Sequence, residues 1–157
     1  MNWDRLLEQF PSVQVLPHFR GEQTLEVPRD DLIPVLKFLK EDPEYAFTML
    51  VDLTAVDYLG YEGKETRFEV VYHLFSLKSR ERVRIKVPVP EDEPEVDSVT
   101  SLWWGANWLE REVFDLFGIR FRGHPNLERL LLWEGFEGHP LRKDYPLREE
   151  PPLPEPK

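Results

Sequence analysis

The stretch RFEVVYHLFSL, at residues 67–77, decides the fold together with ERVRIKV at residues 81–87. In the second stretch, three β-branched apolar residues alternate with basic residues. Such alternation places the two kinds of side chain on opposite faces of a strand. Because the connection at residues 78–80 is short, the two stretches predict an antiparallel β-hairpin with one solvated face.

Further elements are predicted on both sides of this hairpin. Asp30 and Asp31 precede an apolar helical pattern that Pro43 ends, and Gly118 ends the longest helical pattern of the chain. The predicted helices cover residues 2–9, 32–39, 98–117 and 127–133. The predicted strands cover residues 13–16, 24–27, 45–53 and 119–121. The acidic, proline-rich residues 88–97 are predicted to be a loop.

These elements predict an α+β fold of two layers, in which an antiparallel or mixed sheet of four or five strands packs against two main helices. We expect residues 1–122 to form this core domain. Residues 123–157 are rich in proline and poor in core-forming side chains. They are expected to form an extended C-terminal interaction arm that a partner surface orders.

Composition narrows the classes of function. The 157 residues include 30 acidic and 20 basic side chains, so the formal net charge is −10, and an acidic protein repels nucleic-acid phosphates. The chain has no cysteine, which excludes thiolate zinc sites and iron–sulfur clusters bound by this chain. No apolar run approaches the roughly 20 residues that span a bilayer, so we expect no direct insertion into a membrane.

The densest polar cluster consists of Glu110, Arg111, Glu112 and Asp115 in the longest predicted helix. Arg111 and Asp115 are spaced four positions apart, which favours an ordinary salt bridge on a solvated or interface face. The alternative is acid–base chemistry by paired carboxylates. In that alternative the chain is an independent small enzyme that uses Glu110, Glu112, Asp115 and His124.

Two GHP triplets place His124 and His139 between glycine and proline. Their spacing matches no zinc-binding motif, so we expect no metal site and predict that the imidazoles fix turns by bonding to backbone groups. Trp104 and Trp108 lie one helical turn apart. These two side chains either belong to a wide core face of the helix or form part of a protein–protein interface, where tryptophan is enriched.

Two longer runs carry a more specific signal. Residues 110–125, EREVFDLFGIRFRGHP, are followed by residues 138–146, GHPLRKDYP. In their order and separation, these runs closely resemble the C subunit of proton-pumping NADH–quinone oxidoreductase (respiratory complex I). A looser resemblance extends from about residue 45 through the predicted hairpin. One departure is Glu128, which stands where many relatives carry a basic residue, although Arg129 follows it.

The resemblance implies a non-redox structural and assembly subunit of the peripheral arm of that complex. The whole complex transfers electrons from NADH to quinone and pumps protons, and its FMN and iron–sulfur clusters are expected in partner subunits. The implied main partner is the D subunit, with the B and I subunits nearby. The implied location is the cytoplasmic side of the cell membrane, where the chain is held through the complex.

The resemblance also assigns interface and motif residues, but no catalytic, cofactor-binding or metal-binding residue. Arg142, Lys143 and Asp144 are expected to contact another subunit, or else to serve solubility alone. A related membrane-bound hydrogenase or a ferredoxin- or plastoquinone-type oxidoreductase is the alternative parent complex. The assigned motif residues are Glu110, Arg111, Glu112, Asp115, Gly118, His124, Pro125, Arg129, Pro140, Leu141, Arg142, Lys143, Asp144, Tyr145 and Pro146.

Overall fold

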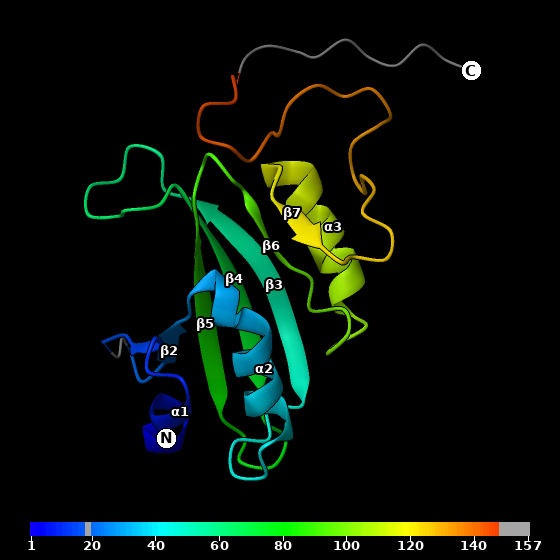
Figure 1. Cartoon of the computed structure of the whole chain (residues 1–157). Coiled ribbons are helices and arrows are strands. Elements are labelled where there is room, and N and C mark those ends of the chain that lie inside the picture. The colour runs from blue at the N-terminus through cyan, green and yellow to red at the C-terminus, as the bar shows by residue number, and fades with distance from the viewer. Residues whose placement is uncertain (18–19, 148–157) are drawn as a thin grey trace.

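The computed structural model describes residues 1–17 and 20–147. Its main sheet has five strands in the order β1-β2-β5-β4-β3 (Figure 1). The strands β2 and β5 pair in parallel and the other neighbours pair antiparallel. The strands are β1 (Gln14–Val15), β2 (Gln23–Glu26), β3 (Met49–Asp57), β4 (Phe68–Phe75) and β5 (Arg82–Val89). The predicted α+β class with a mixed sheet is therefore confirmed.

Two principal helices pack on this sheet. Helix α2 (Leu32–Glu41) lies across β4 and β5, while α3 (Ala106–Phe117) lies beside β3 (Figure 1). A second sheet of two parallel strands, β6 (Glu95–Asp97) and β7 (Arg120–Arg122), brackets α3 in the chain. A short helix α1 (Asp4–Gln9) and a 3-10 turn, η1 (Arg29–Asp31), complete the fold.

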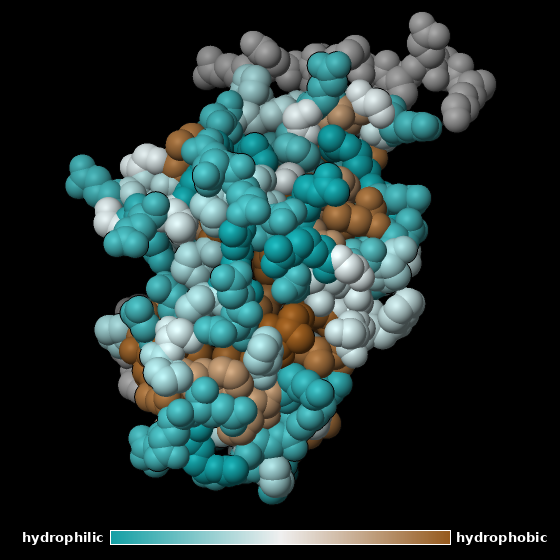
Figure 2. All heavy atoms as spheres, viewed as in Figure 1, coloured by the Kyte–Doolittle hydropathy of each residue, from teal (hydrophilic) through white to brown (hydrophobic). Residues whose placement is uncertain are grey.

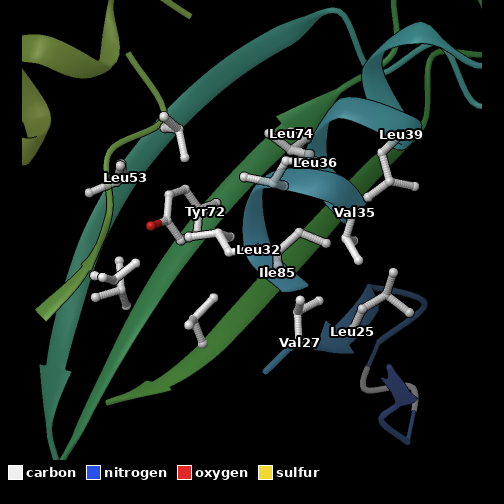
Figure 3. Close-up of a cluster of buried hydrophobic side chains, with 14 of the residues drawn as sticks. Leu25, Val27, Leu32, Val35, Leu36, Leu39, Leu53, Tyr72, Leu74 and Ile85 are labelled. Atoms are coloured by element: carbon white, nitrogen blue, oxygen red, sulfur yellow. The ribbon is translucent and has the colours of Figure 1, made fainter. Parts of the chain in front are cut away.

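The core forms between α2 and the middle of the sheet. Tyr72 of β4 pairs with Leu53 on one side and with Ile85 on the other. Figure 3 shows the leucine and valine side chains of α2 over these residues, and all of the α2 residues drawn there are fully buried. Polar side chains cover most of the face that Figure 2 shows. Apolar side chains are exposed on this face between α2 and α3.

The predicted hairpin forms, since β4 and β5 pair antiparallel over their whole length. The prediction of one solvated face is wrong for β4, because Glu69 and Val71 on its second face are 1% and 5% exposed. Glu69 is covered because Lys64, from the loop before β4, and Lys86 of β5 both bond to its carboxylate. The loop thus closes over a face that the alternation alone assigned to solvent.

Three predicted boundaries are wrong. The strand predicted at 45–53 lies at Met49–Asp57, because the ring of Tyr45 instead stacks on Trp3, with ring centroids 5.4 Å apart. The helix predicted from residue 98 begins only at Ala106. Residues 88–97 are not all loop, because β5 runs to Val89 and residues 95–97 form β6.

The helix predicted at residues 127–133 does not form. The backbone N–H groups of Leu130, Leu131 and Leu132 all donate to the carboxylate of Asp115. Those N–H groups are therefore unavailable for helical hydrogen bonds, and the segment runs as irregular backbone along α3. We call residues 123–147 the C-terminal strap.

Candidate functional site

The first anchor of the strap is Asp115, which is fully buried near the end of α3. Its Oδ2 accepts the three consecutive N–H groups at 2.8–3.0 Å, and its Oδ1 lies 2.9 Å from Nη1 of Arg129. Burial opposes ionisation, but these donors more than offset it, so the pKa of Asp115 lies below its ordinary value. The charge of Asp115 therefore binds strap backbone and Arg129, and its side chain is buried away from solvent.

The predicted salt bridge between Arg111 and Asp115 is wrong. Arg111 instead donates to the carbonyl oxygens of Glu128 and Arg129 at 3.0 and 3.1 Å. Its guanidinium also lies 5.0 Å from the ring centroid of Trp108. The four-residue spacing was misleading because a guanidinium can satisfy strap carbonyls while the carboxylate takes strap N–H groups. Both side chains therefore fasten the strap to α3.

The second anchor surrounds Gly118, which ends α3 with a φ of 73°. A Cβ atom at this position would lie 2.5 Å from Nε2 of His139 and 2.6 Å from Nη2 of Arg142. Nδ1 of His139 lies 2.9 Å from the carbonyl oxygen of Asp115, and Nε of Arg142 donates to the carbonyl of Phe117 at 2.6 Å. Burial lowers the pKa of His139 despite that backbone contact. Glycine here supplies both the left-handed backbone and the space for the strap.

The third anchor is an ion-pair cluster at the end of β3, which the sequence patterns did not predict. Asp57 and Arg67 form two hydrogen bonds of 3.1 and 3.0 Å, and both side chains are almost fully buried. Asp57 also accepts the backbone N–H of Lys143 at 2.9 Å, and Arg67 pairs with Asp144 at 2.7 Å. Burial opposes ionisation, but Arg67 and the N–H donors hold the pKa of Asp57 below its ordinary value.

A signal for this third anchor exists in the sequence. Asp57 and Arg67 flank the loop that joins the two strands, and opposite charges at facing strand ends often pair. No local sequence pattern, however, predicts that Lys143 and Asp144 are the partners of Asp57 and Arg67. The contacts expected between these two residues and another subunit stay a prediction. Within this chain, Lys143 and Asp144 bond to Asp57 and Arg67 of the core.

The imidazoles of both GHP histidines bond to backbone groups, as predicted, and that of His124 does so within its own turn. Nε2 of His124 lies 3.1 Å from the carbonyl of Asn107, and its Nδ1 accepts the N–H of Asn126 at 3.0 Å. Pro125 lies in that turn and is exposed. The imidazole therefore fixes the turn that starts the strap. Within the described residues no group of three or more potential metal ligands occurs.

The remaining motif residues lie on the strap or on α3. Tyr145 stacks on Phe136 with ring centroids 6.1 Å apart, and it occupies the space next to Gly138. Pro146 and Leu141 are exposed, and Pro140 is half-buried. The predicted arm at 123–157 and its boundary stay a prediction, and its residues 148–157 lie outside the described part of the chain. The part that is described bonds closely to the core.

The four residues of the alternative enzyme do not converge on one cavity. Glu110 and His124 lie 3.9 Å apart and are both buried. Asp115 is hydrogen-bonded to the strap, and Glu112 is exposed on α3. A surface hollow of about 510 Å³ is lined by His73, Arg82 and Arg84, among others, and none of the predicted motif residues reaches it.

The tryptophans divide between the core and the surface. Trp103 is buried and donates through its indole N–H to the carbonyl of Thr48 at 2.9 Å. Trp104 and Trp108 are 73% and 60% exposed. The interpretation of these two as core residues is therefore wrong, and their role in a protein–protein interface stays a prediction. None of the helices in the described residues has the length and apolar character needed to cross a membrane.

Comparisons with known proteins identify a family for this chain. The family model described as "Respiratory-chain NADH dehydrogenase, 30 Kd subunit" matches residues 25–151. The C subunit of NADH-quinone oxidoreductase from Roseiflexus sp. (strain RS-1) is 54% identical over 132 residues, which span 84% of this chain and 74% of that protein. Its counterpart in Citrifermentans bemidjiense is 47% identical over 145 residues, or 92% of this chain and 87% of that protein.

Two solved structures and one longer relative are also similar to this chain. A trypsin-resistant fragment of Nqo5 has a TM-score of 0.71 and 37% identity, and the match covers 81% of this chain and 100% of the fragment. A chain of an archaeal membrane-bound sulfane sulfur reductase has a TM-score of 0.75 and 27% identity over 92% of this chain and 83% of its own. The C/D subunit of NADH-quinone oxidoreductase from Sulfurihydrogenibium sp. (strain YO3AOP1) is 49% identical over 82% of this chain and 22% of that longer protein. The chain belongs to the family of the 30 kDa subunit of respiratory-chain NADH dehydrogenase.

Proposed function

We propose that this chain is the C subunit of a proton-pumping NADH–quinone oxidoreductase, where it serves structure and assembly. The observation that carries the proposal is the strap. Its motif residues Arg129, Arg142 and Lys143 are bonded inward to Asp115, to the end of α3 and to Asp57, so they build a rigid surface. Support also comes from the identity of 54%, over 84% of this chain, to a relative that is named as a C subunit.

In this role the chain binds no redox cofactor. The chain has no cysteine, so it offers no thiolate ligand to an iron–sulfur cluster. The FMN and the iron–sulfur clusters reside in the partner subunits. The chain contributes to electron transfer from NADH to quinone by holding those subunits in register, and the complex as a whole couples that transfer to proton translocation.

The D subunit is the proposed main partner. The relative named as a C/D subunit carries a segment 49% identical to this chain within a longer protein. Fusion of two modules in one polypeptide keeps them at high effective concentration, which favours their association. The B and I subunits are the further neighbours, and the complex holds the chain on the cytoplasmic side of the cell membrane. Trp108 on α3 and Trp104, two residues before that helix, are exposed and are proposed to bury against one of these subunits.

A second candidate is the corresponding subunit of another respiratory membrane complex. It is favoured by the likeness to a chain of the sulfane sulfur reductase complex, at a TM-score of 0.75. The two candidates differ in the electron donor and acceptor of the parent complex. They do not differ in the structural role of this chain.

Affinity purification of the tagged chain from solubilised membranes of its host tests the proposal. We expect a large assembly that contains the D subunit and oxidises NADH with quinone as acceptor. Recovery of an intact assembly that does not oxidise NADH would favour the second candidate. Recovery of the chain alone from intact membranes would contradict both.

A further inference from the structure

Glu110 of α3 is a fully buried carboxyl group without a cationic partner. Its Oε1 accepts the backbone N–H of Val99 at 2.7 Å, and its Oε2 lies 2.7 Å from Oγ of Ser98. Within the described part of the chain no Lys or Arg forms an ion pair with it. The neighbouring Arg111 is bonded to strap carbonyls instead. None of the hydrogen bonds described above that fasten the strap involves Glu110.

His124 approaches Glu110 but does not neutralise it. Nε2 of His124 lies 3.9 Å from Oε2 of Glu110. Nδ1 accepts the N–H of Asn126, so Nδ1 carries no hydrogen, and the ring hydrogen on Nε2 donates to the carbonyl of Asn107. Both ring nitrogens are therefore bonded to backbone groups and not to Glu110. An ionised Glu110 would then be a buried charge with only two dipolar donors.

Tyr72 faces the same region from β4. Its hydroxyl is the buried side-chain polar atom that has no hydrogen-bond partner among the described residues. Figure 3 shows this hydroxyl pointing away from α2, toward the side of β6 and α3. Burial first, and then the charges of Glu110 and of Asp97 on β6, raise its pKa. Asp97 itself accepts a hydrogen bond from Arg122 at 2.9 Å.

Two hydroxyl groups connect Glu110 with the surface. Oγ of Ser98 lies 2.8 Å from Oγ1 of Thr100, and either atom can donate. Ser98 is buried, whereas Thr100 is partly exposed. Glu110, Ser98 and Thr100 therefore form a continuous hydrogen-bonded chain from a buried carboxyl group to solvent. Hydroxyl groups can accept and donate at once, so such a chain can pass a proton in either direction.

We propose that Glu110 is a proton-binding site that takes up and releases one proton through the hydroxyl groups of Ser98 and Thr100. On uptake, a hydronium ion at the surface gives a proton to the Thr100 oxygen and becomes water, the Thr100 hydroxyl gives its own hydrogen to Ser98, and Ser98 gives its hydrogen to Oε2 of Glu110. Release reverses each transfer, so one proton enters or leaves and each hydroxyl keeps one hydrogen. The direction of the hydroxyl chain reverses with each event.

The electrostatics of the site agree with this geometry. Burial raises the pKa of Glu110 to about 7, against the bonds from Ser98 and Val99, which favour the charged form. Three other buried carboxyls, Asp57, Glu69 and Asp115, are held ionised by their cations and N–H donors, so their pKa values lie below the ordinary ones. The pKa of Glu110 is therefore shifted in the opposite direction to the pKa values of these three carboxyls.

Infrared titration of the full chain from about pH 5 to about pH 9 tests the site, since ordinary surface carboxyls are already ionised over most of that range. We expect one carboxylic-acid C=O band per chain, with a midpoint near neutrality, that is absent in Glu110→Gln and kept in Glu112→Gln. Ser98→Ala should raise the midpoint, because the ionised form loses a donor. A wild-type chain without this band, or a band that persists in Glu110→Gln, would overturn the proposal.

Unfolding measurements provide a second, independent readout. A folded-state pKa raised above the unfolded one gives stability that is full below the unfolded value and is lost as pH rises toward the folded value. The wild type should therefore lose stability relative to Glu110→Gln between about pH 4.5 and about pH 7. The amide of Gln keeps an acceptor for Val99 and a donor for Ser98. If Glu110→Gln does not fold, Ser98→Ala decides, and an unchanged infrared midpoint in that variant overturns the proposal.

Discussion

The carboxylate of Asp115 and the guanidinium of Arg129 lie 2.9 Å apart, although they belong to a helix and to an irregular strap that follows it. The Asp115 side chain is fully buried, while that of Arg129 is 28% exposed. Because the same carboxylate also accepts three strap N–H groups, the pair works as part of a multi-point clamp. This clamp, rather than a helix, sets the path of residues 129–132.

Replacing Asp115 with Asn should destabilise the chain strongly. The amide NH2 group of Asn would face Arg129 or the strap N–H groups, so at least one buried donor loses its acceptor. Loss of one partner of a buried pair costs about 3 kcal/mol in the free energy of unfolding. Chemical denaturation measures this change, and Glu112→Gln, an exposed change on the same helix, should stay within about 0.5 kcal/mol of wild type. Equal stability of the two variants would contradict the clamp.

Replacing Gly118 with Ala should also destabilise the chain, because the φ of 73° is strained for a residue with Cβ, and that Cβ would lie 2.5 Å from Nε2 of His139. The backbone strain alone costs about 1–2 kcal/mol. Gly105→Ala is the matched control. Gly105 has a φ of −61° and open space around its Cβ position, so its substitution should be neutral or slightly stabilising. Thermal unfolding should separate the two variants, and an equal melting temperature would refute the close packing at Gly118.

Acid should release the strap at the end of β3. The pKa of Asp57 is lowered in the folded chain, so the unfolded chain binds more protons at low pH. The stability that Asp57 contributes is therefore present above about 3.8, the ordinary value, and is lost as pH falls through the lower folded value. Amide exchange at Lys143 should accelerate in this range. In Asp57→Asn the exchange should be fast already at neutral pH, and slow exchange there would contradict the anchoring role.

Replacing both exposed tryptophans with serine should separate folding from assembly. Trp104 and Trp108 are largely exposed, so the free energy of unfolding should fall by about 1 kcal/mol at most, mainly from the lost contact with Arg111. The amount of full-size complex on native gels should fall several-fold, because buried tryptophans dominate interface energies. Trp103→Ala should instead unfold the chain, since Trp103 is buried and bonded to Thr48. Wild-type abundance of the complex in the double variant would place the interface elsewhere.

Local patterns were sufficient for much of the fold. The alternation of residues 81–87 predicts β5, and the charged cap and apolar spacing after Asp31 predict α2. Gly118 correctly marks the end of α3. These features depend on intrinsic conformational preference and on side-chain period, which neighbouring residues already contain. The motif runs likewise identified the family, because that identification needs only the order of residues.

The tertiary structure alone decided what those motif residues do. Arg111 and Asp115 have the spacing of a helical salt bridge, but each finds its partners on the strap. Asp57 accepts the N–H of Lys143 from 86 positions away, and Glu110 is buried where it bonds to Ser98 and Val99. A carboxylate binds whichever donors the fold brings within about 3 Å. The role of each carboxylate in this chain follows from the donors that long-range packing delivers, and sequence spacing does not contain that information.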